Sequence, residues 1–373
     1  MSADREASVE TYGHTPVSRI FAARDVYGIG YDEGRAARRP LRLGIVGAGG
    51  VAQSKHLPAI NRLRTLWEPV EVAAIAEPDA RQGRKVATVY GCHYYAGLPE
   101  MLAAEELDGV EILSPDHLHV EHALACIEAG LPVLVEKPLA ATLDEARRLC
   151  EAAERRGALL LAVANKRFSP PYRRAKRLIG EGAIGAPRLL SGKFTLGYDY
   201  VDLLRDGTIH LFDLVLHLMG PAASLYAARS PAAPDTVALT LTFRSGAVGA
   251  LHTTAAALSL KPWERVEVYG DGKWLAVDDQ WELTLYDDEA GPAKSWRPAI
   301  PNTLLFDEEF GGYLGQIENF LQVIRNAELP AVTGWDGYRA CELVAATRRS
   351  LDTGGPVPLP LDETCPIAAE AGP

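Results

Sequence analysis

Cysteine is scarce in this chain of 373 residues, which has five cysteines at positions 92, 126, 150, 341 and 365. Their number is odd and no two are spaced as Cys-x-x-Cys, so the sequence indicates neither a disulfide framework nor a zinc knuckle. A secretory signal is also missing, because the first 39 residues contain no basic start followed by an apolar stretch of about 7 to 15 residues. We therefore expect a cytoplasmic protein.

Long apolar runs and an excess of positive charge are missing as well. The apolar runs are short segments such as 159–164, far below the roughly 20 residues of a membrane-spanning helix. Lys and Arg number 38 against 49 Asp and Glu, and the formal net charge of -11 disfavours binding to a phosphate backbone. We therefore expect no membrane span and no nucleic-acid partner.

What the sequence does contain is the composition of a globular protein, with 47% hydrophobic and 23% charged residues. The length exceeds what one hydrophobic core usually serves, so two domains are expected. Residues 1–39 show no sustained helical or strand period and are predicted to form an N-terminal extension. Its mixed composition is compatible with a disordered tail, or with an arm that packs on the body or on a neighbouring subunit.

From residue 41 to 163 the chain alternates short apolar runs with helical segments. The predicted strands are 41–46, 70–76, 110–113, 131–135 and 159–163. The predicted helices are 53–66, one that ends near residue 130, and 142–157. Strands separated by helices of about ten or more residues indicate repeated βαβ units, and hence a parallel sheet covered on both faces.

The second half has a different pattern, with strands predicted at 237–243, 247–256, 264–269, 273–277 and 282–286. Short turns that contain Gly and Asp connect most of them, and short connections favour antiparallel neighbours. Two further helices are predicted at 312–325 and 337–351.

A glycine-rich motif follows the first predicted strand. Residues 47–52 form a G-x-G-x-x-A fingerprint between a strand and a helix. Gly47 permits a tight turn, Gly49 removes the Cβ that would block a pyrophosphate, and Ala52 lets helix and strand approach closely. The helix N-terminus supplies N–H donors to the anion. The motif predicts a dinucleotide site that includes Gly47, Gly49, Gly50, Val51 and Ala52.

An acidic residue ends the second predicted strand. Glu77 follows Ala52 by 25 residues, where a carboxylate can accept hydrogen bonds from the adenosine ribose. A carboxylate there repels a 2′-phosphate, so we expect NAD rather than NADP as the cofactor, although Arg81 leaves NADP open. The alternative for Glu77 is a solvated side chain at a strand end.

Three further motifs complete a pattern: Ser114-Pro115-Asp116-His117-Leu118-His119, Glu136-Lys137-Pro138, and Asp206-Gly207-Thr208-Ile209-His210 with Asp213. Together with the glycine motif and His56, they resemble the glucose-fructose oxidoreductase, inositol dehydrogenase and rhizopine-catabolism family (Gfo/Idh/MocA) over residues 41–358. Members of that family mostly oxidise or reduce a secondary alcohol of a sugar, cyclitol or related polyol with NAD(P). The resemblance therefore implies an NAD(P)-dependent dehydrogenase with a small-molecule substrate.

The resemblance also implies the architecture. Residues 40–164 would form a Rossmann domain, a doubly wound parallel sheet, and residues 165–373 an α/β domain with an open, mostly antiparallel sheet. The exposed face of that sheet often serves for oligomerisation in the family, so a homo-oligomer, a dimer or a tetramer, is expected. By the same resemblance, the cofactor-binding set extends to Ser114, Pro115, Asp116, His119, Glu136 and Lys137.

Lys137 and His210 are the predicted catalytic pair, with Asp206 beside them. Lys137 follows a strand at the sheet edge where open α/β folds bind ligands, and its ammonium can stabilise charge on the reacting oxygen. His210, with an ordinary pKa of about 6.5, suits proton transfer near neutral pH, and Asp206 is expected to orient its ring. The alternatives are a surface ion pair for Lys137 and a core histidine for His210.

The spacing of Asp206, His210, Asp213 and His217 predicts one polar stripe on an otherwise apolar helix. Asp213 either binds a substrate hydroxyl or merely belongs to the stripe, and His217 is better explained as a core histidine. The predicted substrate-binding residues are Lys137, Asn165, Arg167, Tyr198, Asp206 and His210.

A metal site is the last candidate, formed by His117, His119 and His122 beside Asp116. Because zinc sites usually recruit ligands from more than one element, and this segment lies where the nicotinamide ribose would pack, we expect no metal. Three rival functions remain: NAD-assisted glycoside cleavage in the same family, a metal-dependent isomerase or lyase that uses the polar stripe, and a regulator that binds dinucleotide without turnover.

Overall fold

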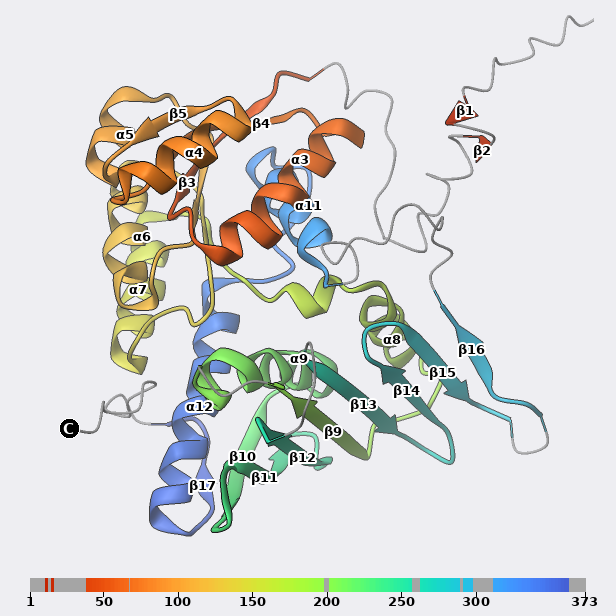
Figure 1. Cartoon of the computed structure of the whole chain (residues 1–373). Helices are drawn as coiled ribbons and strands as arrows, with labels where there is room; N and C mark the ends of the chain where they lie inside the picture. The colour runs from red at the N-terminus through yellow and green to blue at the C-terminus, as the bar shows by residue number, and fades with distance from the viewer. Residues whose placement is uncertain are drawn as a thin grey trace, which may run out of the picture.

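The computed structural model describes residues 11–12, 15–16, 38–66, 68–197, 201–256, 262–288, 291–297 and 311–361. Within the predicted N-terminal extension, strands β1 (Thr11–Tyr12) and β2 (Thr15–Pro16) pair with each other in antiparallel fashion. Apart from these strands and residues 38–39, the extension lies outside the described residues. The remaining elements form two sheets with helices packed on them (Figure 1).

The first sheet has six parallel strands in the order β5-β4-β3-β6-β7-β8. They are β3 (Leu41–Val46), β4 (Val70–Ala76), β5 (His93–Tyr95), β6 (Gly109–Ile112), β7 (Val133–Val135) and β8 (Leu160–Ala162). Most of these residues are buried on both faces, which is why the strands appear as unbroken apolar runs in the sequence. The strand order reverses between β3 and β6, so a crevice is expected beyond their carboxyl ends.

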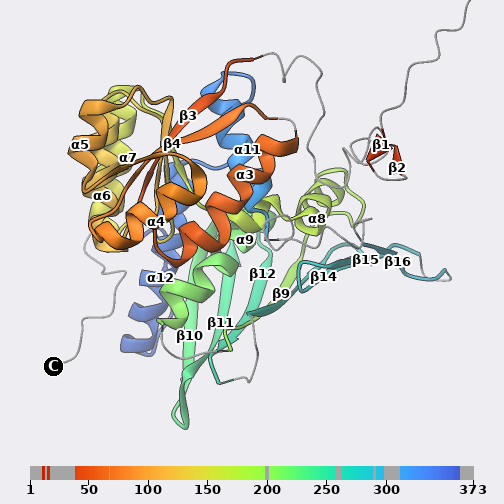
Figure 2. The same cartoon turned by 45° about the horizontal axis from the view of Figure 1, so that its top comes forward.

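Helices cover both faces of this sheet (Figure 2). On one face lie α3 (Leu57–Leu66) and α4 (Ala80–Tyr90). On the other lie α5 (Leu98–Ala104), α6 (His119–Glu128) and α7 (Leu143–Arg156). The expected doubly wound parallel sheet is therefore confirmed. Helix α7 begins at a capping box of Thr142 and Glu145 and ends at Gly157, which is left-handed with φ 60°.

The second sheet has nine strands in the order β16-β15-β14-β13-β9-β12-β11-β10-β17. They are β9 (Leu189–Thr195), β10 (Ala222–Ser230), β11 (Ala233–Phe243), β12 (Val248–Thr254), β13 (Trp263–Tyr269), β14 (Trp274–Asp278), β15 (Glu282–Tyr286), β16 (Lys294–Trp296) and β17 (Val357–Pro358). All neighbours run antiparallel except β9 and β12. The expectation of a mostly antiparallel sheet in the second half is confirmed.

Helices pack on one face of this second sheet. They are α8 (Pro170–Gly180), α9 (Ile209–Met219) and α12 (Gly334–Thr353). The burial of β12 alternates strictly along the strand, so every second side chain points away from the helices. In Figure 2 the sheet spreads out below these helices with its other face turned away from them.

Two C-terminal helices return to the first sheet, as the blue ribbon in Figure 1 shows. Helix α11 (Tyr313–Ile324) packs beside α3, and its Ile317 and Phe320 join the apolar cluster of Leu43 and Leu134. Helix α12 packs against α7 as well as α9. Residues from the end of the chain thus hold the two sheets together and fix the cleft between them.

Candidate active site

The glycine turn after β3 is closely packed at Gly47 and open at Gly49 and Gly50. Gly47 has φ 94°, and a Cβ there would lie 2.7 Å from the carbonyl oxygen of Leu113, so only glycine fits. A Cβ at Gly49 or Gly50 would meet no atom within 4 Å. The surface in front of these two residues is open, at the start of the helix that follows, as a bound diphosphate requires.

Glu77 holds this turn in place. Its carboxylate accepts a hydrogen bond from the N–H of Ala48 at 2.8 Å and another from the N–H of Asp79 at 3.0 Å, and the residue is 9% exposed. The carbonyl of Ala48 in turn accepts from the side-chain amides of Gln53 and Gln82. Contact between Glu77 and a ribose stays a prediction; the role that the structure gives to this carboxylate is to fix the peptide between the glycines.

Most of the other predicted cofactor residues meet in one cleft. It is lined by Val51, Leu113, Ser114, Asp116, His119, Glu136, Lys137, Pro138, Arg205 and Asp206. His119 is 2% exposed, and its two ring nitrogens lie 2.8 Å from the carbonyl oxygens of Ser114 and Pro138. His119 therefore joins the loops after β6 and β7. Pro115 directly precedes the 3-10 turn Asp116–Leu118.

Lys137 reaches across the cleft from the first sheet to the segment before α9. Its Nζ donates a hydrogen bond to the backbone oxygen of Asp206 at 3.0 Å and lies 4.0 Å from the Asp206 carboxylate. Arg205 makes the reverse connection, since it pairs with Asp116 at 3.2 Å as well as with Asp206. The predicted residues Lys137 and Asp206 are thus brought together by two different parts of the fold.

The expected polar stripe is interrupted, because residues 203–208 form a π-helical turn before α9 begins. A π turn closes hydrogen bonds from residue i to i+5 where an α turn closes them from i to i+4, so the regular α-helical spacing of the stripe is broken at Asp206. The carboxylate of Asp206 accepts from the N–H of Asp202 and from Arg205 instead. The expectation that Asp206 orients the His210 ring by a hydrogen bond is therefore not met by this arrangement.

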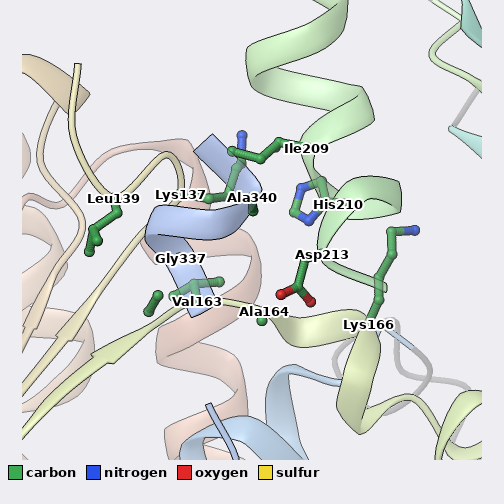
Figure 3. A pocket seen from close by; sticks show the side chains of 11 residues that line it. Lys137, Leu139, Val163, Ala164, Lys166, Ile209, His210, Asp213, Gly337 and Ala340 are labelled. Carbon is green, nitrogen blue, oxygen red and sulfur yellow. The ribbon is translucent and has the colours of Figure 1, made fainter. Parts of the chain in front are cut away.

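His210 faces a narrow cavity that Lys137 enters from the opposite side (Figure 3). The same cavity is lined by Lys166 and Asp213. Burial, and then the ammonium groups of Lys137 and Lys166, lower the pKa of His210 well below its ordinary value against the opposing charge of Glu136. The imidazole is therefore neutral at neutral pH and able to accept a proton.

The contacts that the structure gives to Arg167 and Asn165 are with other residues of the protein. The guanidinium of Arg167 forms a buried pair with Asp213, with a shortest distance of 2.6 Å, and contacts Asp336 at 3.0 Å. Asn165 donates to the carbonyl of Gly311 at 2.6 Å. The sequence-based choice within this segment missed Lys166. Residues 165–168 form a 3-10 turn, in which successive side chains point about 120° apart, so only the middle residue of the three lines the cavity.

The remaining candidate residues are not among those that line the cavity of Lys137 and His210. His217 lines a different cavity together with Arg167, and burial followed by the charges of Arg167 and Lys176 lowers its pKa to about 3. Tyr198 lies outside the described residues. His122 contacts the hydroxyl of Ser114. Among the residues that the structure describes, no three His, Cys, Asp or Glu side chains are grouped so that they could hold a metal ion.

No helix in the described part of the chain is long and apolar enough to cross a membrane. This finding agrees with the short apolar runs of the sequence.

Two family models match the chain: the oxidoreductase family with an NAD-binding Rossmann fold over residues 41–164, and its C-terminal alpha/beta domain over residues 203–359. Myo-inositol 2-dehydrogenase of Thermotoga maritima is 26% identical over 84% of this chain and 96% of its own length. D-apiose dehydrogenase of Paraburkholderia graminis is 27% identical over 84% and 88%. The structure of a levoglucosan dehydrogenase in complex with NADH has the same fold, with a TM-score of 0.79, 21% identity, and coverage of 86% and 100%.

The Arg167–Asp213 pair gives the first test. Replacement Arg167→Leu leaves the Asp213 carboxylate buried without its cation, and should lower the free energy of unfolding by about 3–5 kcal/mol. The double variant Arg167→Leu/Asp213→Leu removes both charges and should lose less. Urea denaturation measures both. A single variant within about 1 kcal/mol of the wild type would contradict a structural role for this pair.

Proposed function

Since the chain belongs to the Gfo/Idh/MocA family of NAD-binding oxidoreductases, we propose that its dehydrogenase activity interconverts a secondary alcohol and a ketone of a sugar, cyclitol or related polyol. The observation that carries this proposal is the meeting in one cavity of Lys137, from the loop after β7, and His210, from α9. Oxidation of a carbinol requires two groups from the protein: a cation that stabilises charge on the reacting oxygen, and a neutral base that accepts the hydroxyl proton.

The coenzyme site follows from the glycine turn. We infer that the N–H groups at Gly49, Gly50 and Val51 hold the diphosphate, with Ser114, Pro115, Asp116 and Glu136 along the cleft toward the nicotinamide. Glu77 places a carboxylate behind the turn, which favours NAD over NADP through repulsion of a 2′-phosphate. When bound, the coenzyme takes up or returns the hydride.

Lys137 and His210 then have different roles at the substrate oxygen. The Lys137 ammonium exchanges the carbonyl of Asp206 for the substrate hydroxyl and stabilises negative charge that develops on it. His210, kept neutral by burial and its neighbouring ammonium groups, accepts the hydroxyl proton and returns it in the reverse direction. Asp206 acts through Lys137, whose position it sets.

The walls of the cavity suit a polyhydroxylated substrate. Lys166 and Asp213 line the same cavity as His210, where an ammonium group can donate hydrogen bonds and carboxylate oxygens can accept them. Hydroxyl groups both donate and accept, so a sugar or cyclitol can satisfy both kinds of side chain at once. The similarity to inositol and apiose dehydrogenases supports the same substrate class.

The exposed face of the second sheet supports a homo-oligomer. One row of paired residues crosses its central strands: Tyr226, Thr240, Ala250 and Ser191. The row consists of small or uncharged side chains, and Tyr226 at 40% exposed is among the large hydrophobic residues left open to solvent. We propose that this face is buried against a second copy of the chain.

We also propose a cytoplasmic location. A reducing cytoplasm would keep the free thiols reduced, which are Cys92, Cys126, Cys150 and Cys341.

The substitution His210→Ala tests the catalytic assignment. With NAD and a panel that includes myo-inositol, D-apiose and levoglucosan, kcat should fall about 100- to 10,000-fold while the Kd for NADH stays unchanged. Because the pKa of His210 is lowered, wild-type oxidation should lose rate only well below pH 6.5. His217→Ala, on the same helix but in another cavity, is the matched control. Wild-type turnover in the His210 variant would contradict the catalytic assignment. A preference of the wild-type enzyme for NADP would contradict the assignment of NAD as the coenzyme.

The sheet interface has its own test. Ala250→Arg places a charge and a long side chain in the middle of the exposed row, and should convert the oligomer to a monomer of unchanged fold. Sedimentation velocity measures the mass, and circular dichroism checks the fold. A wild-type protein that sediments as a monomer, or a variant that stays oligomeric, would refute the proposed interface.

A further inference from the structure

A wholly buried histidine lies beneath the proposed active site and takes no direct part in the chemistry described so far. His56 is 0% exposed and ends the π-helical turn Ala52–His56 that follows the glycine motif. Its Nδ1 lies 2.8 Å from a carboxylate oxygen of Glu111, and its Nε2 lies 3.2 Å from one of Glu136. Both carboxylates are buried as well. Tyr313 of α11 packs edge-on against the ring.

This geometry fixes the charge of the ring. A carboxylate can only accept hydrogen bonds, so two carboxylates on one imidazole require both ring nitrogens to donate, and the ring is then an imidazolium. Burial lowers the pKa of His56, but the charges and hydrogen bonds of Glu111 and Glu136 outweigh it and raise the pKa to about 9. For Glu136, burial is likewise outweighed by His56, and the pKa falls to about 2.

The three side chains form a carboxylate–imidazolium–carboxylate cluster with a net charge of one negative unit. The second oxygen of Glu111 is buried without a hydrogen-bond partner among the described residues, so the contact with His56 is the ion pair that the structure gives to this carboxylate. Since a buried charge without a partner is costly, the imidazolium of His56 offsets the cost of burying these two acids.

Glu136 passes the effect of the cluster to Lys137. Its other oxygen accepts the backbone N–H of Lys137 at 2.7 Å, at the end of β7. Lys137 then extends across the cleft to Asp206. His56 thus connects the helix that begins at the glycine turn with the loop that carries the lysine, through one buried carboxylate.

We propose that His56 is a positioning residue of the active site: its imidazolium holds the Glu136 carboxylate in place, Glu136 in turn sets the orientation of Lys137, and the net charge of the cluster sets the electrostatic field at Lys137 and His210. The catalytic consequence rests on the proposed function. The charge coupling within the cluster does not, because it concerns ground-state protonation alone.

The field at His210 has contributions from several elements. Lys137 and Lys166 favour its neutral form, and Glu136 opposes them. Asp213 lines the same cavity from the same helix. Loss of the His56 charge adds one net negative unit near this group and should stabilise protonated His210, so its pKa should rise.

A charge-matched pair of variants tests this. With Glu111 and Glu136 ionised, His56→Gln changes the net charge of the cluster from one negative unit to two, whereas His56→Gln/Glu111→Gln restores one. In NMR titrations of the full chain with labelled imidazole nitrogens, the single variant should raise the midpoint of His210 by about one pH unit, and the double variant should return it toward the wild type. A role in packing alone predicts no such rescue, since the double variant retains the same altered ring site. His93→Gln, on an exposed histidine of β5, is the control.

Two further readouts complete the test. In the wild type, His56 should stay protonated on both nitrogens at pH 7, and a neutral ring in the folded protein would overturn the proposal even if the variants fail to fold. An unchanged His210 midpoint in folded His56→Gln would also overturn it. If the wild type turns over a substrate, the pH at which kcat/KM falls on the acid side should be higher in His56→Gln, by the same amount as the His210 midpoint. The affinity for NADH should be retained. A protein that shows the NMR coupling but oxidises no polyol would instead contradict the proposed function.

Discussion

The ammonium of Lys137 on the backbone oxygen of Asp206 is the contact around which the two halves of the molecule are arranged. It spans residues 69 positions apart, one at the end of a parallel strand and the other in a π-helical turn. A lysine can reach that far only if the two sheets keep a fixed separation. Helices α11 and α12, which pack on the first sheet although they come from the end of the chain, supply that constraint.

Around this contact almost every buried charge has an opposite charge beside it. Lys166 pairs with Glu264 and Arg167 with Asp213, so neither cation stands alone in a medium of low dielectric constant. Beneath them, His56 neutralises one of its two acids. His210 differs from these groups, because burial and the charges of Lys137 and Lys166 outweigh that of Glu136 and keep its ring neutral. A lone neutral base next to an ammonium group is the arrangement that the proposed proton transfer uses.

The sequence predicted the first sheet well because strands such as 41–46 and 70–76 are buried on both faces and appear as unbroken apolar runs. Strand β9 was missed, since its exposed face inserts polar residues between buried ones and a glycine weakens the pattern. At the site, Lys166 was missed and Asp206 was expected against His210, because 3-10 and π turns change the direction of side chains without a distinctive sequence signal. The pairing of His56 with Glu111, 55 residues away, has no local pattern at all.

We propose that a nicotinamide coenzyme lies along the cleft from the open glycine turn to the cavity between Lys137 and His210. A crystal structure of the full chain with NADH tests this most directly. We expect density for the diphosphate in front of Gly49 and Gly50, and a nicotinamide ring that faces both catalytic side chains. Density for the coenzyme elsewhere, or a nicotinamide ring turned away from Lys137 and His210, would contradict it.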